Sequence, residues 1–134
     1  LPWANRMLLI KEGAVIRDDA PAAIFYAPQN EYEAKLLGAC NCIPVSMFPR
    51  IQQLITDANT DQQLYIRPSQ LLLEKPTGNG LQGIVTGVLF MGSHYMVQLQ
   101  IDGLVLEVSS FERGITLGET YGVRLRDNAQ YLLL

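Results

Sequence analysis

The stretch YMVQLQIDGLVLEVS, residues 95–109, specifies its own strand pairing. If Asp102 and Gly103 form a two-residue type I′ turn, positions 101 and 104, 99 and 106, and 97 and 108 face one another. A register slip of one residue would expose every side chain on the buried face. The stretch therefore predicts a β-hairpin with one buried face and a positive φ at Gly103. The inward residues are Ile101, Leu104, Leu99, Leu106, Val97, Val108 and Tyr95, and the outward ones are Gln98, Gln100 and Glu107.

Further strands are expected on both sides of this hairpin. Gly83–Phe90 is rich in β-branched residues, and Met91-Gly92-Ser93 then turns the chain, which predicts a three-stranded meander. Short apolar runs recur throughout residues 63–134, separated by turn residues. Six or seven short strands in this range favour a closed or nearly closed antiparallel barrel, which hides its edges. In the first of these strands, Leu64 and Ile66 alternate with Tyr65 and Arg67, and Pro68 then turns the chain. A loop is expected at Lys75–Gly80. In the strand near the C-terminus, we expect Tyr121, Val123 and Leu125 to face inward and Arg124 and Arg126 to face outward.

The first 38 residues predict a hairpin and two helices. Met7–Ile10 and Ala14–Arg17 are expected strands, and the continuous apolar run in the first suits burial on both faces. Pro21 is well placed to start a helix through Tyr26. Asn30 and Glu33 resemble a capping box for a second helix that ends at Gly38, with Tyr32, Leu36 and Leu37 as its apolar stripe.

Residues 39–61 carry weaker signals. Cys42–Met47 suits a strand that Pro44 confines to the edge of a sheet. Ile51, Leu54, Ile55 and Ala58 are spaced for a short helix that stops at Asn59.

Composition limits the possible functions. The chain has 134 residues, a net charge of −3 and no apolar run long enough for a membrane helix, so we expect a soluble cytoplasmic protein. The acidic balance argues against nucleic-acid binding. Cys40 and Cys42 lie far from the single histidine, and a zinc site needs about four ligands. We therefore expect buried, reduced thiols and no metal site.

Two parts of the chain resemble one family. Residues 5–38 are similar to the end of the nucleotide-binding domain of an ATP-binding-cassette importer ATPase. Residues 64–134 resemble the OB-like regulatory barrel, called TOBE, of the same subunits. The matching segments in the second part are Ile66-Arg67-Pro68, Gly83–Phe90, Gly92-Ser93-His94-Tyr95 and Val123-Arg124-Leu125.

The resemblance implies three regions and one architecture. Residues 1–38 would be the remnant of the nucleotide-binding domain, 39–61 a linker or first barrel segment, and 62–134 the TOBE domain. The expected fold is mainly β: a small antiparallel OB-like barrel preceded by a short β-hairpin and two helices. The subunits of the family are peripheral on the inner face of the cell membrane and contact transmembrane permease subunits through the nucleotide-binding domain.

Two departures from the family pattern matter. Ala20 stands where the family usually has a threonine helix cap, and it should weaken this helix start by about 1 kcal/mol. The chain also lacks a G-x-x-x-x-G-K-[S/T] phosphate loop and the other ATPase motifs. We therefore expect no catalytic residues and no cofactor in this chain, whereas the full-length subunit would bind ATP and Mg.

Few side chains suggest a binding site. His94 lies beside Ser93 at the mouth of a hairpin, and Arg124 and Arg126 protrude from one strand face, where they could hold an anion or a partner's carboxylates. Each residue has a plainer interpretation as a turn or a solvated strand face. The carboxylate pair Asp18-Asp19 precedes a predicted helix, and acidic residues are favoured at the positive N-terminal end of a helix dipole, so the pair does not indicate a binding site.

Two functions of different classes follow. The resemblance favours a regulatory module that joins two ATPase subunits as a homodimer, possibly with residues 1–38 exchanged between chains. The alternative is a barrel that binds a small oxyanion such as molybdate or sulfate and senses the transported substrate. The Ser-Ala-Arg-Asn motif of molybdate-binding relatives is absent here.

Overall fold

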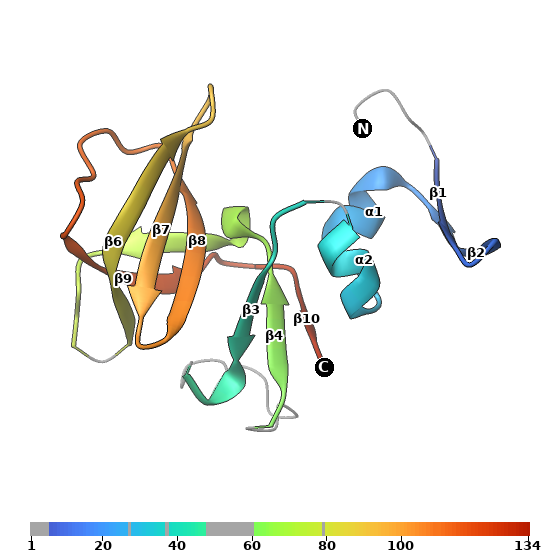
Figure 1. Cartoon of the computed structure of the whole chain (residues 1–134), viewed down its shortest axis with the longest axis horizontal. Coiled ribbons are helices and arrows are strands. Elements are labelled where there is room, and N and C mark those ends of the chain that lie inside the picture. Colours follow the sequence, from blue (N-terminus) through green and yellow to red (C-terminus); the bar gives the residue numbers. More distant parts are fainter. Residues whose placement is uncertain (1–5, 27, 37, 48–60, 79) are drawn as a thin grey trace.

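The computed structural model describes residues 6–26, 28–36, 38–47, 61–78 and 80–134, which form a five-stranded sheet, a three-stranded sheet and a separate two-stranded hairpin (Figure 1). The order in the larger sheet is β5-β9-β6-β7-β8, and in the smaller one β10-β4-β3. The elements are β1 (Met7–Lys11), β2 (Ala14–Asp19), α1 (Pro21–Tyr26), α2 (Glu31–Leu36), β3 (Asn41–Pro44), η1 (Val45–Met47), β4 (Gln63–Ile66), η2 (Pro68–Gln70), β5 (Leu71–Glu74), β6 (Leu81–Phe90), β7 (Tyr95–Ile101), β8 (Leu104–Ser110), β9 (Thr120–Leu125) and β10 (Tyr131–Leu133).

The central hairpin has the predicted register. Strands β7 and β8 pair Ile101 with Leu104, Leu99 with Leu106 and Val97 with Val108. Of these residues only Leu104 is more than slightly exposed, and it still packs against the core. The meander β6-β7-β8 is likewise confirmed.

The turn of this hairpin corrects one expectation. Asp102 has a φ of 47°, whereas Gly103 is not among the glycines with positive φ. A positive φ at the first central residue alone is the pattern of a type II′ turn, so the predicted positive φ at Gly103 is wrong. Types I′ and II′ both match the twist of paired strands, which is why the register is unaffected.

Strand β6 allows the larger sheet to curl. It pairs with β7 on one side and β9 on the other, and its register with β7 shifts between Val85 and Gly87. A Cβ atom on Gly83 would lie 2.6 Å from an Ile101 side-chain carbon and 2.8 Å from the Gln100 carbonyl oxygen, so the strands approach closely only because this residue is glycine. The edge strands β5 and β8 come near one another, and the sheet forms a nearly closed barrel (Figure 1).

The smaller sheet lies against the barrel. Strand β3 is an edge strand, as predicted, but it ends at Pro44, and Val45–Met47, expected to continue the strand, forms the 3₁₀ helix η1. The Asn41 side chain, only 6% exposed, donates to the Glu107 carbonyl oxygen at 2.7 Å and accepts from the Glu107 N–H at 2.8 Å. The Asn41 side chain thus pairs with the main-chain N–H and carbonyl of Glu107, which would otherwise be unpaired at the edge strand β8.

Strand β4 and the residue that follows it are buried on both faces. Tyr65 and Arg67 are 7% and 4% exposed, nearly as buried as Leu64 and Ile66. Both faces of this segment are therefore covered, which the alternation of residue types did not indicate.

The N-terminal hairpin is buried on one face only. Leu9 is 5% exposed, but Leu8 and Ile10 are 53% and 59% exposed, so burial of Met7–Ile10 on both faces is not found in this chain. Glu12 and Gly13, between β1 and β2, have φ values of 51° and 79°, the signs of a type I′ turn.

The cap of α2 forms as predicted. The Glu33 N–H donates to Asn30 Oδ1 at 2.9 Å, and Asn30 Nδ2 donates to Glu33 Oε2 at 3.2 Å.

Leu37 and the helix expected at 51–59 lie outside the described residues. In the described part of the chain, every helix is too short or too polar to cross a membrane.

Candidate functional site

The junction between the N-terminal segment and the barrel is centred on Arg67. This residue follows β4 and has φ −70° and ψ 147°. Its extended conformation is the one imposed on any residue that precedes a proline, here Pro68. Because successive side chains of an extended segment alternate, Arg67 projects away from the barrel core that Ile66 enters.

The Arg67 guanidinium binds main-chain carbonyls of the N-terminal segment. Nε donates to the Phe25 carbonyl oxygen at 3.2 Å, and Nη1 donates to those of Gly38 and Ala39 at 3.1 and 3.2 Å. The guanidinium carbon also lies 4.4 Å from the centroid of the Phe25 ring. Carbonyls at and beyond helix C-termini carry partial negative charge, so a cation is favoured there. One side chain thus fixes the ends of both helices to the barrel.

Burial of Arg67 has an electrostatic cost. Removal from water lowers the pKa of its guanidinium, and a smaller electrostatic contribution from Cys40 acts in the opposite direction. Among the described residues, Nη2 of Arg67 has no hydrogen-bond partner although it is buried.

A second buried cation holds the N-terminal segment together. Arg17 Nη1 of β2 lies 2.6 Å from Glu33 Oε1 of α2, and the two side chains are 9% and 1% exposed. Removing one partner of such a pair leaves the other charge unpaired in a buried site, which is destabilising. The hairpin β1–β2 is therefore tied to α2, and α2 is tied to the barrel through Gly38 and Arg67.

The predicted ligand residues lie in two separate places. Ser93 and His94 form the exposed tip between β6 and β7, where Ser93 Oγ and His94 Nδ1 are 2.9 Å apart. Arg124 makes an ion pair with Glu74 at 3.2 Å, and Arg126 donates to the Ser69 carbonyl oxygen at 2.6 Å.

The strand register shows how far apart these places are. Leu81, at the start of β6, pairs with Val123, next to Arg124. The tip follows Phe90, nine residues further along the same strand, or about 30 Å at 3.3 Å per residue. The four side chains do not form one site.

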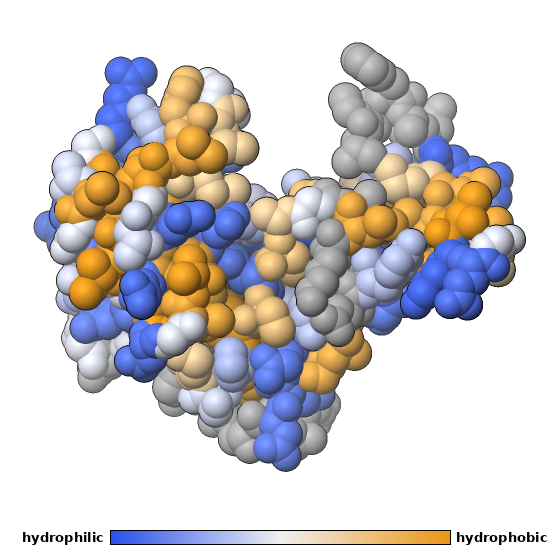
Figure 2. Space-filling view, viewed as in Figure 1, coloured by the Kyte–Doolittle hydropathy of each residue, from blue (hydrophilic) through white to orange (hydrophobic). Residues whose placement is uncertain are grey.

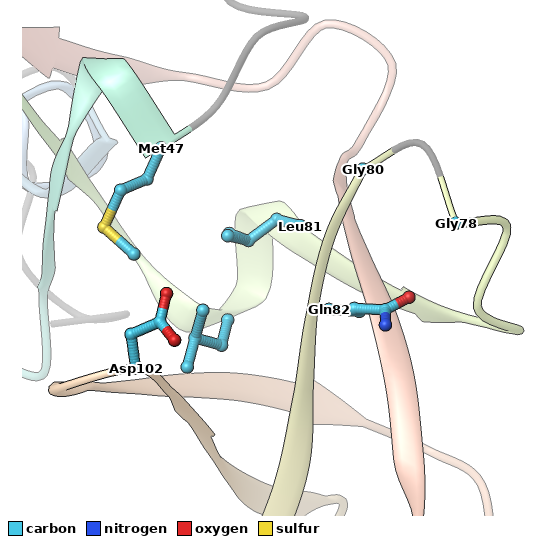
Figure 3. Close-up of a pocket in the computed structure, with 7 residues that line it drawn as sticks. Met47, Gly78, Gly80, Leu81, Gln82 and Asp102 are labelled. Atoms are coloured by element: carbon cyan, nitrogen blue, oxygen red, sulfur yellow. The ribbon is translucent and has the colours of Figure 1, made fainter.

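A hollow beside the β7–β8 turn has a volume of about 320 Å³ (Figure 3). Among the described residues that line it, Asp102 is the only charged one, and its carboxylate lies near the side chains of Met47 and Leu81 in the close-up. A carboxylate disfavours an oxyanion in this hollow. Within the described residues no cluster of histidine, cysteine or acidic side chains is arranged to hold a metal ion.

Two exposed apolar surfaces lie at opposite ends of the molecule. Figure 2 shows hydrophobic residues over β1 and β2 at one end and over the barrel at the other. On the hairpin, Leu8, Ile10 and Val15 are more than half exposed. At the barrel tip Leu89, Phe90 and Phe111 are also more than half exposed, and the ring centroids of His94 and Phe111 are 6.2 Å apart.

The importance of Arg67 could not be read from the sequence pattern. Arg67-Pro68 marked a turn, but an arginine beside a turn is usually solvated. Its carbonyl partners are main-chain atoms 28 to 42 residues away, and such contacts leave no residue-type signature.

The fold described here is that of a small antiparallel barrel of the OB-like class with an N-terminal segment fixed to it. The chain belongs to the TOBE domain family, whose model matches residues 64–133. This confirms the resemblance inferred from the Ile66-Arg67-Pro68 and Gly92-Ser93-His94-Tyr95 segments.

Curated relatives extend the similarity beyond the barrel. The chain is 23% identical to the spermidine/putrescine import ATP-binding protein PotA of Acetivibrio thermocellus, over 93% of this chain and 38% of that protein. It is 22% identical to the Fe(3+) ions import ATP-binding protein FbpC of Agrobacterium fabrum, over 93% of this chain and 39% of that protein. A PotA protein of Borrelia garinii is 27% identical over 75% of the chain. The chain thus spans about two fifths of the length of the first two relatives.

Proposed function

We propose that this chain is the C-terminal regulatory part of the ATP-binding subunit of an ATP-binding-cassette importer. Residues 62–134 are the TOBE domain, 39–61 connect it, and 1–38 are the end of the nucleotide-binding domain. The observation that carries the proposal is the similarity to importer ATP-binding proteins over 93% of the chain, which takes in far more than the barrel. The complete subunit would work with transmembrane permease subunits at the inner face of the membrane and would bind ATP and Mg.

The contacts of Arg67 support a role in regulation. Regulation by a separate domain requires that movement of one domain is felt by the other. Arg67 binds a carbonyl in the last turn of α1 and another just after α2, so a shift of either helix would act directly on the barrel.

The names of the relatives do not indicate one transported substrate for this chain. PotA proteins are named for spermidine and putrescine and FbpC for Fe(3+), yet the identities are almost equal. Polyamines and ferric ions share little chemistry, so this similarity favours a common regulatory function over a common ligand.

The test of regulation uses the complete subunit assembled with its permease. Removing residues 62–134 should leave nucleotide binding intact and change how strongly the transported substrate stimulates ATP hydrolysis. A subunit without its barrel that keeps the same substrate-stimulated rate would contradict the proposal.

The chain alone should not bind nucleotide. Phosphate binding by these ATPases depends on a glycine-rich loop and its lysine, and the sequence contains neither in the required pattern. Calorimetry with a non-hydrolysable ATP analogue should give no binding heat, and a saturable signal would overturn this expectation.

The oxyanion alternative has a direct test. Tungstate, sulfate and ferric citrate can be compared by thermal shift, since a ligand that binds only the folded state raises the melting temperature. Arg124 and Arg126 already have protein partners, and the hollow contains a carboxylate, so we expect no shift. A rise of several degrees with one anion would favour the alternative.

A further inference from the structure

The hollow beside the β7–β8 turn has no role in the function proposed above. It lies where three parts of the chain meet: the 3₁₀ helix η1, the start of β6, and the end of β7 with its turn. Leu81 and Ile101, 8% and 7% exposed, supply apolar wall, and Met47 of η1 adds a thioether side chain. Its volume of about 320 Å³ is at the lower end of the range for small-molecule sites, which occur in the mouths of β-barrels.

The carboxylate of Asp102 points into this hollow. In Figure 3 it faces the side chains of Met47 and Leu81, whereas the side chain of Gln82 points to the other side of β6. Asp102 makes no ion pair with any residue that the structure describes. A negative charge without a protein counter-charge therefore lies beside an apolar surface.

We propose that the hollow binds a small primary alkylammonium ion, with the ammonium group against the Asp102 carboxylate and the hydrocarbon chain against Met47, Leu81 and Ile101. An ammonium group donates three hydrogen bonds, and a bond from it to a carboxylate is about twice as strong as one between neutral groups. The flexible methionine side chain adapts its shape to the alkyl chain. The inference holds whether or not the chain regulates an importer.

Other classes of ligand fit the hollow less well. An oxyanion is repelled by Asp102, and a neutral apolar molecule would take water from the carboxylate without giving it a partner. A calcium ion takes six to eight oxygen ligands, and one carboxylate does not supply them. Thiophilic metals need thiolates, but Cys40 and Cys42, which are half-buried and not buried as the sequence suggested, are not among the described residues that line the hollow.

The ligand would touch both sheets of the molecule. Met47 follows β3 of the smaller sheet, whereas Leu81 and Ile101 belong to β6 and β7 of the larger one. Binding should therefore move the amide signals of η1 together with those of the β7–β8 turn in a nuclear magnetic resonance spectrum.

The test is a titration of the chain with n-butylammonium chloride, at an ionic strength held constant with sodium chloride. The amide signals of Met47, Leu81 and residues 101–103 should move and reach a plateau. Methylammonium has the same charge without the chain, and n-butanol has the chain without the charge. Each should bind at least about tenfold more weakly, because burial of one methylene group alone strengthens binding about fourfold. Equal affinities, or shifts without a plateau at these residues, would overturn the proposal.

Asp102→Asn removes the charge and keeps the turn, since asparagine is one of the residues that adopt a positive φ readily. It should weaken butylammonium binding about tenfold or more, while unchanged signals elsewhere in β7 and β8 show that the variant is folded. Asp127→Asn is the matched control, because it makes the same change in net charge at an exposed turn residue that does not line the hollow. Its affinity should stay within about twofold of wild type. Unchanged affinity in Asp102→Asn, or equal losses in the two variants, would show that no site is built around Asp102.

Discussion

Arg67 and Phe25 are joined by two contacts at once. Arg67 Nε donates to the Phe25 carbonyl oxygen at 3.2 Å, and the guanidinium carbon lies 4.4 Å from the centroid of the Phe25 ring. The carbonyl contact fixes the plane of the guanidinium, and the ring covers one of its faces. A lysine offers a point charge and no planar surface, so it would reproduce only part of this arrangement.

Replacing Arg67 should loosen the N-terminal segment selectively. Arg67→Met removes the three hydrogen bonds that the buried guanidinium makes to main-chain carbonyls, which we expect to cost about 2–4 kcal/mol. Hydrogen exchange should speed up in α1 and α2 and change little in β7 and β8. Denaturant unfolding and exchange mass spectrometry measure the two effects.

Arg124→Met is the matched control for this substitution. Arg124 is exposed and pairs with Glu74, and exposed pairs contribute at most about 1 kcal/mol. Equal losses of stability in the two variants would show that the buried contacts of Arg67 contribute no more to stability than the ion pair of Arg124.

The β7–β8 turn should be sensitive at Asp102 and tolerant at Gly103. Asp102 has a φ of 47°, where a β-branched residue is strained, so Asp102→Val should lower stability by about 1–2 kcal/mol. Nothing lies within 4 Å of a Cβ atom placed on Gly103, and its φ is outside the left-handed region, so Gly103→Ala should have little effect. Melting temperatures that rank these variants in the opposite order would contradict the turn assignment.

Local patterns were enough to predict the barrel. The β7–β8 hairpin is determined by alternation on both sides of a two-residue turn, and a wrong register would expose the residues that pair across it. The cap at Asn30 and Glu33 and the edge position imposed by Pro44 depend on neighbouring residues only. Each of these features is present in the structure.

Features that depend on distant contacts could not be predicted. The N-terminal helices place their carbonyls against Arg67, and this converts an apparently outward position into a buried one. Glu33 was assigned to a helix cap, but its burial beside Arg17 depends on how β2 packs against α2. The sign of φ at Gly103 is a choice between two turns that share one register. Sequence periodicity carries no information on any of these three points.

Glu119 should make stability depend on pH in acid. Its carboxylate accepts from the side chain and N–H of Thr116, and from the Tyr121 hydroxyl at 3.1 Å, and these bonds hold its pKa below the usual range. A carboxyl group with a lowered pKa in the folded state stabilises the protein fully above its unfolded pKa and loses that effect as the pH falls through the folded pKa.

Glu119→Gln provides the comparison. Wild type should melt at a higher temperature than the variant at neutral pH, and the gap should begin to narrow near the ordinary glutamate pKa of about 4.3 and close as the pH falls through the lowered pKa of the folded state. Melting curves across this range measure the gap, and one that widens in acid would contradict the assignment.

The last prediction concerns the outer face of the N-terminal hairpin. Ile10 and Val15 are cross-strand partners, and both are exposed, together with Leu8 on the same strand as Ile10. Apolar surface is stabilised by roughly 25 cal/mol for each Å² removed from water, so covering this face is favourable. In the complete subunit proposed above, the rest of the nucleotide-binding domain would lie against it.

In the isolated chain, a second copy is the partner with the same exposed face, and a two-fold contact between identical faces is the commonest solution. We therefore expect a homodimer at micromolar concentration, with a light-scattering mass of about twice the 14.9 kDa of one chain. Ile10→Lys should return the chain to the single-chain mass, because the contact would bury an unpaired charge beside its symmetry mate. Leu89→Lys adds the same charge at the barrel tip and should leave the dimer intact. If Leu89→Lys alone dissociates it, two copies associate through their barrels, and the prediction of a dimer through the hairpin face is wrong.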